Sequence, residues 1–311
     1  MLIIRDSDDQ RIERSVVTTG AFDGVHLGHQ AVISEVSSRA KARGVPSAVV
    51  TFDVHPATVV RPDSAPKLLT RLPRKLELLE SFGVDVVYVI EFDEARSTTT
   101  AARFVDEVFV DRLGAEEILV GSDFHFGKGR EGTVEFLAAE GESKGFSVEG
   151  LELIRGSADA TEPVSSTAIR RALDGGDVMG AGRMLGRPFE IRGVVTQGDQ
   201  RGRTIGFPTA NVVLPDDMAR PANGVYACRY LTPDGVVRPA AVNVGVRPTF
   251  YDSADSALLE AHLLDFDGDL YDQIAQVQFE LFLRSERRFN GINELQSQLK
   301  ADIADARAVL H

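Results

Sequence analysis

Cysteine is almost absent from this chain of 311 residues, because Cys228 is its single cysteine. One cysteine excludes an intramolecular disulfide and any metal site built on a cluster of cysteines. Long apolar runs are also absent: a membrane-spanning helix needs roughly 20 apolar residues, and the longest stretches, such as 84–90, contain polar interruptions. Residues 1–14 lack the basic and apolar regions of a secretory signal. These absences predict a cytoplasmic protein with no membrane partner.

Positive charge is in deficit, with 34 lysines and arginines against 47 aspartates and glutamates, and the formal net charge is −13. Proteins that bind nucleic-acid backbones usually show a basic face, because contacts to phosphates dominate their affinity. The deficit therefore argues against a nucleic-acid partner. It leaves small phosphorylated ligands open, since these need only a local positive site.

The length is about twice that of a typical domain, so two domains are expected. In the first half, short β-branched segments alternate with segments of helical periodicity. This alternation predicts an α/β doubly wound parallel sheet, in which ligands bind beyond the carboxyl ends of the strands. The expected strands are 15–22, 47–53, 84–92 and 117–121, and the expected helices are 30–43, 72–82 and 100–113.

The second half shows strand-like segments with no crossover helix between them, followed by a helical pattern over 292–310. This arrangement predicts an antiparallel β-barrel with a C-terminal helix. A glycine-rich stretch follows an expected helix at 167–173, so the boundary is placed near 182–188, giving domains 1–185 and 186–311. The expected barrel strands are 189–197, 225–231, 240–246, 258–266 and 274–283.

The segment 20–29, GAFDGVHLGH, stands directly after an expected strand and directly before an expected helix. Its glycines allow sharp turns and a close approach of the backbone to a ligand. His26 and His29 are three residues apart, so they share a face on the first helical turn. Because a helix N-terminus favours anions, the pair predicts a site for a triphosphate and for charge that develops on departing pyrophosphate.

Two alternatives to this phosphate site are an ordinary polar surface and a zinc site. Zinc needs a third protein ligand, for which His55 is the nearby candidate. Two other glycine-rich segments carry no phosphate-loop prediction. Segment 121–128 fails the P-loop spacing, and segment 180–186 fails the dinucleotide-binding pattern and follows a helix.

The pattern in 20–29 resembles the HxGH motif of the nucleotidyltransferase superfamily. Its longer form, GxFDGxHxGH, resembles the adenylyltransferase module of bacterial bifunctional riboflavin kinase/FAD synthetases. Further segments match that family in order: 52–56 (FDVHP, with Val54 in place of a proline), 120–127 (VGSDFHFG) and 164–170 (VSSTAIR).

The VSSTAIR segment also has a physical meaning of its own. Ser165 or Ser166 can cap the helix that follows, while Thr167 and Arg170 lie within one turn of its positive end. The alternative is an ordinary helix cap without a ligand. Pro163 departs from the family pattern, since some relatives carry a basic residue there.

A second motif lies at 198–211, GDQRGRTIGFPTAN. A flexible glycine arch can surround phosphates with backbone N–H groups, and Thr209 and Asn211 offer the oxygen ligands that Mg²⁺ prefers. The alternative is a plain glycine-rich hairpin.

PTAN resembles the riboflavin kinase barrel, and 224–227, 243–250 and 259–271 match that family in order. The resemblance implies that Glu260 is the general base, which would accept a proton from the ribityl hydroxyl as it attacks the γ-phosphate. Asp265, Asp267 and Asp269 lack the calcium-loop pattern and are interpreted as loop residues.

The resemblance spans residues 15–310 and implies a bifunctional enzyme of flavin cofactor biosynthesis. Its barrel would convert riboflavin and MgATP to FMN, and its nucleotidyltransferase module would join FMN to AMP from a second ATP, giving FAD and pyrophosphate. The implied catalytic residues are His26, His29, Arg170 and Glu260. The implied phosphate ligands are Gly20, Phe22, Asp23, Gly24, Gly28, Ser165, Ser166, Thr167, Gly198, Gly202, Arg203 and Gly206; the flavin-side residues are Asp53, His55, Asp123 and Phe124; and the Mg²⁺ ligands are Thr209 and Asn211.

Rival interpretations are an enzyme that adenylylates another phosphorylated cofactor precursor, and a flavin-binding regulator without turnover. The PTAN barrel argues against the first. A tRNA-ligating enzyme, suggested by HxGH alone, is disfavoured by the acidic charge and by the lack of an anticodon-binding region.

Overall fold

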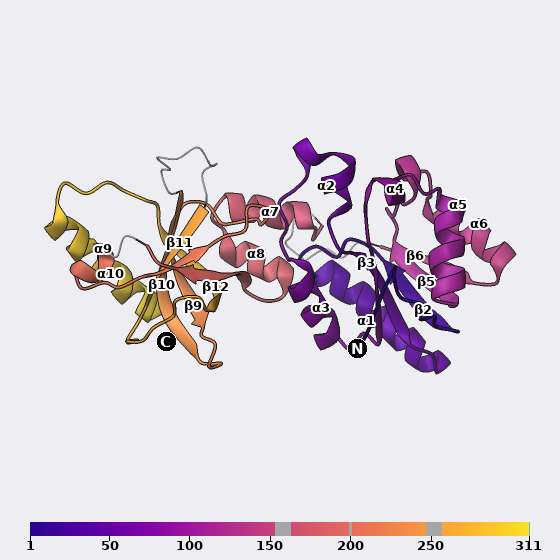
Figure 1. Ribbon diagram of the computed structural model, residues 1–311, viewed down its shortest axis with the longest axis horizontal. Helices are drawn as coiled ribbons and strands as arrows, with labels where there is room; N and C mark the ends of the chain where they lie inside the picture. Colours follow the sequence, from indigo (N-terminus) through magenta and orange to yellow (C-terminus); the bar gives the residue numbers. More distant parts are fainter. Residues whose placement is uncertain (153–162, 199–200, 247–256, 311) are drawn as a thin grey trace. The chain divides into compact units, whose positions relative to one another are not determined.

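The computed structural model describes residues 1–152, 163–198, 201–246 and 257–310, and it divides into two compact units, Met1–Ser166 and Thr167–His311 (Figure 1). The elements of the first unit are β1 (Leu2–Arg5), β2 (Ser15–Thr19), α1 (Leu27–Arg43), β3 (Ser47–Phe52), α2 (Pro56–Val60), the 3₁₀ turn η1 (Pro62–Ser64), α3 (Leu72–Ser81), β4 (Val86–Ile90), α4 (Glu94–Ser97), α5 (Ala101–Phe104), the π-helix η2 (Val105–Arg112), β5 (Ala115–Gly121), the 3₁₀ turn η3 (Lys128–Arg130), α6 (Val134–Lys144) and β6 (Ser147–Leu151).

The first unit contains a six-stranded parallel sheet in the order β1-β4-β3-β2-β5-β6, which confirms the predicted doubly wound class. From β2 the chain winds outward through β3 to β4, whereas β5 pairs with the opposite edge of β2. The direction of winding therefore reverses between β2 and β5. Open sheets of this kind bind ligands at such a reversal point, beyond the carboxyl ends of the strands.

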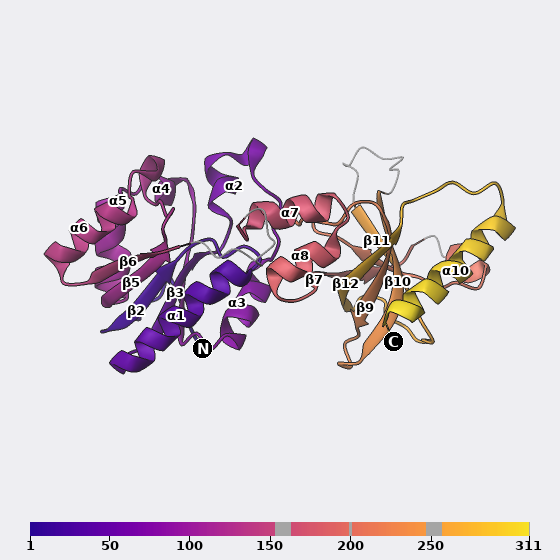
Figure 2. The same ribbon diagram turned by 180° about the vertical axis from the view of Figure 1, so that it is seen from behind.

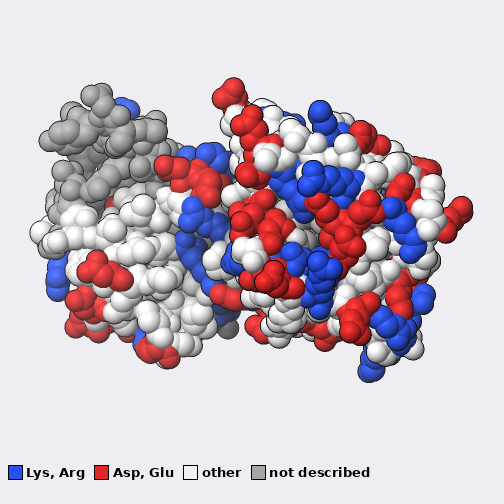
Figure 3. Space-filling view, turned by 45° about the vertical axis from the view of Figure 1, so that its right-hand side comes forward, with Lys and Arg blue, Asp and Glu red and all other residues white. Residues whose placement is uncertain are grey.

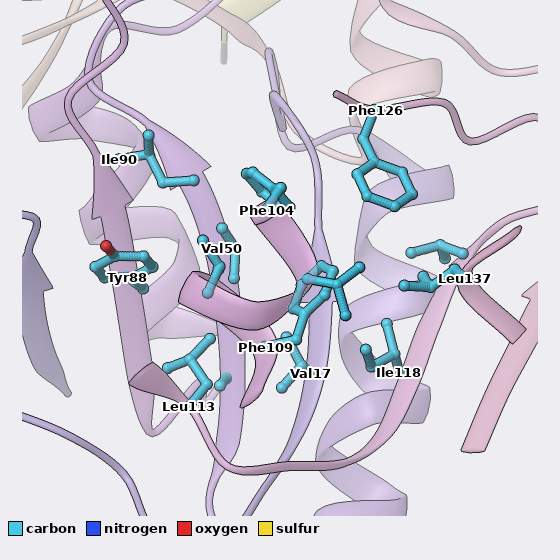
Figure 4. Close-up of a cluster of buried hydrophobic side chains, with 14 of the residues drawn as sticks. Val17, Val50, Tyr88, Ile90, Phe104, Phe109, Leu113, Ile118, Phe126 and Leu137 are labelled. Carbon is cyan, nitrogen blue, oxygen red and sulfur yellow. The ribbon is translucent and has the colours of Figure 1, made fainter. Parts of the chain in front are cut away.

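Helices cover both faces of this sheet (Figures 1 and 2). Successive strand residues point to opposite faces, and the core follows that rule. Val49 packs with Ile33 of α1 and Leu79 of α3, whereas its neighbour Val50 packs with Phe109 of η2 in the cluster of Figure 4. The central strands β2, β3 and β4 are thus buried on both sides, which explains their largely apolar character.

The predicted helix 100–113 takes a different form in the structure. A short α5 passes directly into the π-helical η2, whose turns are wider than those of an α-helix. Phe104 and Phe109 lie edge to face at 5.4 Å between ring centroids, and both point into the cluster shown in Figure 4. Strands β1 and β6 and helix α6 were not expected from the sequence pattern, because their segments are short or mostly polar.

Charges of both signs are interleaved on the face of the N-terminal unit that Figure 3 brings forward. The unit also contains ion pairs between such side chains, since Glu107 binds both Arg96 at 2.6 Å and Arg103 at 2.5 Å. This view of the unit therefore shows no continuous basic field of the kind that tracks a nucleic-acid backbone.

The second unit contains a closed barrel in the order β10-β11-β8-β7-β12-β9, with antiparallel neighbours, which confirms the predicted barrel and terminal helix. Helix α10 packs Ala306 and Leu310 onto the barrel, and α8 contacts β7 and β12. The elements are α7 (Ser166–Asp174), α8 (Val178–Leu185), β7 (Phe189–Thr196), α9 (Arg201–Thr204), β8 (Ala210–Val213), β9 (Gly224–Leu231), β10 (Val237–Val246), β11 (Ala257–Leu263), β12 (Ile274–Arg284) and α10 (Ile292–Leu310).

Asp302 joins α10 to the end of β12 and carries a stability prediction. It is 3% exposed, and its carboxylate accepts two hydrogen bonds from Arg284 at 2.7 and 2.6 Å. Asp302→Ala is expected to destabilise the barrel unit by about 2–3 kcal/mol, somewhat less than for a fully buried pair, because Arg284 retains some access to solvent. Thermal unfolding measures this, with the exposed Asp305→Ala as control; equal melting temperatures for the two variants would contradict the prediction.

Candidate active sites

Three of the sequence motifs meet at one edge of the parallel sheet. The loop 20–26 follows β2, the segment 53–55 follows β3, and the loop 122–127 follows β5. Because these strands are parallel neighbours, their carboxyl ends lie at the same edge. The first and third loops also flank the point where the winding reverses. The topology thus gathers motifs that are about 100 residues apart in the sequence.

The loop after β2 has an unusual backbone. Phe22, Gly24 and Val25 all have positive φ, at 48°, 85° and 40°. A β-branched residue in this region is strained, and such strain persists only where surrounding contacts hold it. Those contacts centre on Asp23, which is 3% exposed. Its Oδ1 accepts hydrogen bonds from the backbone N–H groups of Leu69 and Thr70 at 2.8 and 3.1 Å.

Ser166 contributes a further contact to this loop, since its Oγ donates to the backbone oxygen of Asp23 at 2.8 Å. Ser166 is the first residue of α7, so its side chain reaches back to the loop. The carboxylate of Asp23 is therefore engaged by backbone donors, and the structure shows it holding the loop. Thr167 and Arg170 continue α7 within the second unit, and their phosphate-binding roles stay predictions.

His26 and His29 form a stacked pair at the start of α1. His26 caps the helix, and its Nδ1 accepts a hydrogen bond from the backbone N–H of His29 at 3.4 Å. The two rings stack with centroids 3.6 Å apart, and the Phe22 ring meets His29 edge-on at 5.1 Å. A side chain at Gly28 would bring a Cβ within 3.2 Å of the His26 ring, which explains the glycine between the histidines.

His29 combines a buried ring nitrogen that has no hydrogen-bond partner among the described residues with a lowered pKa. Its Nδ1 is buried and has no hydrogen-bond partner among the described residues, and buried polar atoms are rarely left in this state. The pKa of His29 lies well below its usual 6.5, first because of burial and then because of His26 and Lys75. The ring is therefore neutral at pH 7 and can donate one hydrogen bond to a phosphate oxygen.

Lys75 is a residue of this region that the motifs did not indicate. It lies on α3, is 7% exposed, and donates to Thr51 Oγ1 at 3.2 Å and to the backbone oxygen of Phe52 at 3.4 Å. Burial lowers its pKa to about 8. A sequence pattern could have found it, because Lys75 shares the apolar face of its helix with Leu78 and Leu79.

The flavin-side candidates lie on the other two loops of this edge. Asp53 Oδ1 accepts from the backbone N–H of Phe92 at 2.9 Å, and His55 caps α2 through its Nδ1. Asp123 is exposed, and Phe124 stacks on Phe126 at 5.3 Å. Within the described part of the chain, no three His, Cys, Asp or Glu side chains are grouped to hold a metal, so nothing there supports the zinc alternative.

In the barrel, three polar side chains form a row across adjacent strands. Glu260 of β11 is paired with Asn211 of β8 on one side and with Asn243 of β10 on the other. Directly opposite residues share a face of the sheet, and Asn243 Nδ2 lies 3.5 Å from Glu260 Oε2. Asn243 was not among the predicted site residues, although it opens the matched segment 243–250. Residues 247–250 of that segment lie outside the described residues.

Two cavities adjoin this row and share Thr209. One, of about 320 Å³, is lined by Asn211, Arg203 and the loop 266–271. The other, of about 300 Å³, is lined by Glu260, Asn243 and the aromatic ring of Phe289, among others. Asp267 and Asp269 line the first cavity, whereas Asp265 binds Arg307 at 2.6 and 2.9 Å.

The glycine arch supports Asn211 directly. A Cβ at Gly198 would lie 2.5 Å from Asn211 Nδ2, so only glycine leaves that side chain in place. A Cβ at Gly202 would lie 2.4 Å from the backbone oxygen of Phe207. Gly206 has φ +89°, a conformation that favours glycine. Residues 199–200 of the arch lie outside the described residues.

Comparisons with known proteins agree with this division into two sites. The family model for FAD synthetase matches residues 8–168, and the model for riboflavin kinase matches residues 185–310. A solved structure described as a macrolide-efflux protein from Streptococcus pneumoniae has a TM-score of 0.86 and 30% identity, covering 99% of each chain. The efflux activity in that description is said of the Streptococcus protein alone. Among the described residues, no helix has the length and apolar character needed to span a membrane.

Curated relatives match over nearly the whole chain. The bifunctional riboflavin kinase/FMN adenylyltransferase of Pseudomonas fluorescens is 42% identical, covering 99% of this chain and 98% of its own. The enzyme of the same description from Bacillus subtilis is 38% identical, covering 94% and 92%. This chain therefore belongs to the bifunctional riboflavin kinase/FMN adenylyltransferase family, with its FAD synthetase domain N-terminal and its riboflavin kinase domain C-terminal.

Proposed function

We propose that each reaction has its own set of residues, with the boundary between the two domains near residue 186. The support is the pair of separate polar sites, one at the edge of the parallel sheet and one in the barrel. The family models leave 169–184 unmatched, and the barrel strands begin at Phe189. A single substitution in one site should then remove one activity and leave the other.

In the N-terminal site, the stacked His26 and His29 would bind the ATP phosphates at the start of α1. His29 carries this proposal, because its buried Nδ1 has no partner among the described residues. A phosphate oxygen of FMN attacks the α-phosphorus of ATP while the bond to the bridging oxygen breaks, and pyrophosphate leaves with the electron pair. Donors at the helix N-terminus would stabilise the charge that develops on it. Gly20, Gly24 and Gly28 would let the backbone approach, and Arg170 would add a positive charge.

In the barrel, Glu260 would act as general base on the ribityl hydroxyl of riboflavin. Its position in the row between Asn211 and Asn243 supports this role, because it lines one cavity while Asn211 lines the other. Thr209 lines both cavities, so it lies where a phosphoryl group would pass from ATP to riboflavin. The cavity lined by Asn211 would hold the nucleotide, and the cavity lined by Glu260 would hold the flavin.

Thr209 and Asn211 would hold Mg²⁺ that arrives with ATP. Hydroxyl and amide oxygens are suitable donors for this ion, and Gly198 keeps the Asn211 amide in place. When bound, Mg²⁺ neutralises charge on the phosphate oxygens.

We also propose that the enzyme works in the cytoplasm. A single, buried cysteine, which allows no internal disulfide, agrees with this location.

The Mg²⁺ proposal is tested by Gly198→Ala, which displaces Asn211. The Mg²⁺ concentration for half-maximal FMN formation is expected to rise by about tenfold, the usual lower effect of losing support for a metal ligand. Chromatography of FMN and FAD made from riboflavin and ATP across a Mg²⁺ titration measures it.

The control variant for this titration is Gly175→Ala, because a Cβ there stays 3.5 Å from its nearest neighbours. Adenylylation of supplied FMN provides an internal control, since its Mg²⁺ requirement should not change. An unaltered Mg²⁺ requirement for FMN formation in Gly198→Ala would remove Asn211 as a ligand.

A further inference from the structure

Lys75 is a buried cation at the carboxyl edge of the parallel sheet. Its Nζ contacts two acceptors at the end of β3, Thr51 Oγ1 at 3.2 Å and the backbone oxygen of Phe52 at 3.4 Å. Phe52 is also the first residue of the FDVHP segment, which contains the flavin-side candidates Asp53 and His55. Lys75 therefore joins the apolar face of α3 to the edge where the motifs meet.

The positive charge of Lys75 carries a cost in the folded chain. Burying an ammonium group is costly unless it is paired, and Lys75 has no ion pair within 4 Å among the residues that the structure describes. Its two acceptors are neutral. The remaining side chain packs beside Leu78 and Leu79, where a methionine of similar length would be accommodated at lower cost. The positive charge is thus retained at the expense of stability, as is common at functional sites.

Charged and titratable groups from three neighbouring segments interact electrostatically with this ammonium group. Asp23 from the loop after β2 and Asp53 from the end of β3 favour its charged form, while His29 of α1 is close enough for Lys75 to lower the pKa of its ring. The Oδ1 atom of each aspartate already accepts hydrogen bonds from two backbone N–H groups. Lys75 therefore interacts electrostatically with His29 on the ATP side and with Asp53 on the flavin side, while its Nζ contacts the end of β3.

We propose that Lys75 is a further basic catalytic residue of FMN adenylyl transfer, whose ammonium group binds phosphate oxygens where the FMN phosphate meets the α-phosphate of ATP. The inference rests on the proposed location of this reaction at His26 and His29. The reaction brings two anionic phosphates into contact, and a cation in a water-poor site reduces their repulsion more strongly than one in water. An ammonium group has three donors, so it can keep its acceptors and bind phosphate as well.

The test compares Lys75→Met and Lys75→Arg with Lys41→Met, which makes the same change on the exposed end of α1. With supplied FMN and ATP, Lys75→Met is expected to lower kcat/KM for FAD formation by about 10²-fold, the lower range for loss of one transition-state donor. Its melting temperature should be unchanged or higher. Lys75→Arg should recover at least part of the rate, and FMN formation should be normal in all three variants.

A pH profile adds a readout that a structural role would not change. The pKa of Lys75 is about 8, so kcat/KM for FAD formation should decline as pH rises through about 8 and the ammonium group loses its proton. In Lys75→Arg this decline should move to higher pH, because arginine stays charged.

The outcomes separate this inference from the site assignment on which it rests. If Lys75→Met keeps kcat/KM within twofold, or loses rate only in proportion to a lowered melting temperature, the inference is wrong. If that happens while His29→Ala still lowers FAD formation by roughly 10²–10³-fold, the His26–His29 site stands and only the role of Lys75 is overturned. If neither variant affects FAD formation, both proposals fail.

Discussion

Replacing His29 with alanine is expected to lower FAD formation from FMN and ATP by roughly 10²–10³-fold, the usual effect of removing one donor to a transition state. The reason is structural: the buried Nδ1 has no partner in the described residues, so its hydrogen-bonding capacity is available to substrate. Riboflavin phosphorylation should continue at its normal rate, because it takes place in the barrel. Separate assays with supplied FMN and with riboflavin measure the two steps.

His29→Asn is the informative companion variant, because an amide retains a donor and should keep more activity than alanine. The lowered pKa of His29 has a second consequence. The unfolded chain binds a proton at His29 below about pH 6.5, whereas the folded chain resists it, so this residue reduces the stability of the N-terminal unit as pH falls through that value. His29→Asn should remove this contribution. An equal loss of FMN and FAD formation in His29→Ala would contradict the assignment.

Glu260→Gln is expected to have the opposite selectivity, lowering FMN formation by about 10²–10⁴-fold, the range for loss of a general base. Glutamine preserves the size of the side chain and its place in the row beside Asn243, so the barrel should remain folded. Adenylylation of supplied FMN should be unaffected. Initial rates of FMN formation at saturating riboflavin and ATP test this directly.

The matched control is Glu280→Gln, which makes the same change on β12, where Glu280 binds Arg229 at 3.0 Å. That variant should phosphorylate riboflavin normally. A normal kinase rate in Glu260→Gln would remove Glu260 as the base, and a loss in Glu280→Gln of the same size would show that any change of charge on the barrel suffices.

Local patterns predicted most of the elements because each pattern has a direct physical cause. Buried strands such as β3 read as continuous apolar runs, and the alternation of such strands with amphipathic helices specifies a parallel sheet. Helix α10 was predicted with its observed bounds, 292–310, and a glycine directly precedes it. Strands β1 and β6 lacked these features: β1 has four residues, and β6 is largely exposed.

The residues of the candidate sites also fall into two groups, those that the sequence motifs named and those that they did not. The motifs named His26, His29, Thr209, Asn211 and Glu260, because the residue types and spacings suit phosphate and metal chemistry. They did not name Lys75, because a lone lysine in a helix is usually on the surface. It shares the apolar face of α3 with Leu78 and Leu79, and the fold established that it is buried. The motifs also placed Asp23 among the phosphate ligands, which stays a prediction; its carboxylate accepts the backbone N–H groups of residues 69 and 70.

The fold class and the motifs follow from periodicity, glycine positions and residue chemistry, all of which act over a few neighbouring residues. The pairing of Glu260 with Asn211 and Asn243, the stacking of His26 on His29 and the burial of Lys75 depend on strand register and on packing between distant segments. Register and burial are properties of the whole folded chain, because every long-range contact contributes to them. Tertiary structure alone therefore decided which of the polar side chains share a site.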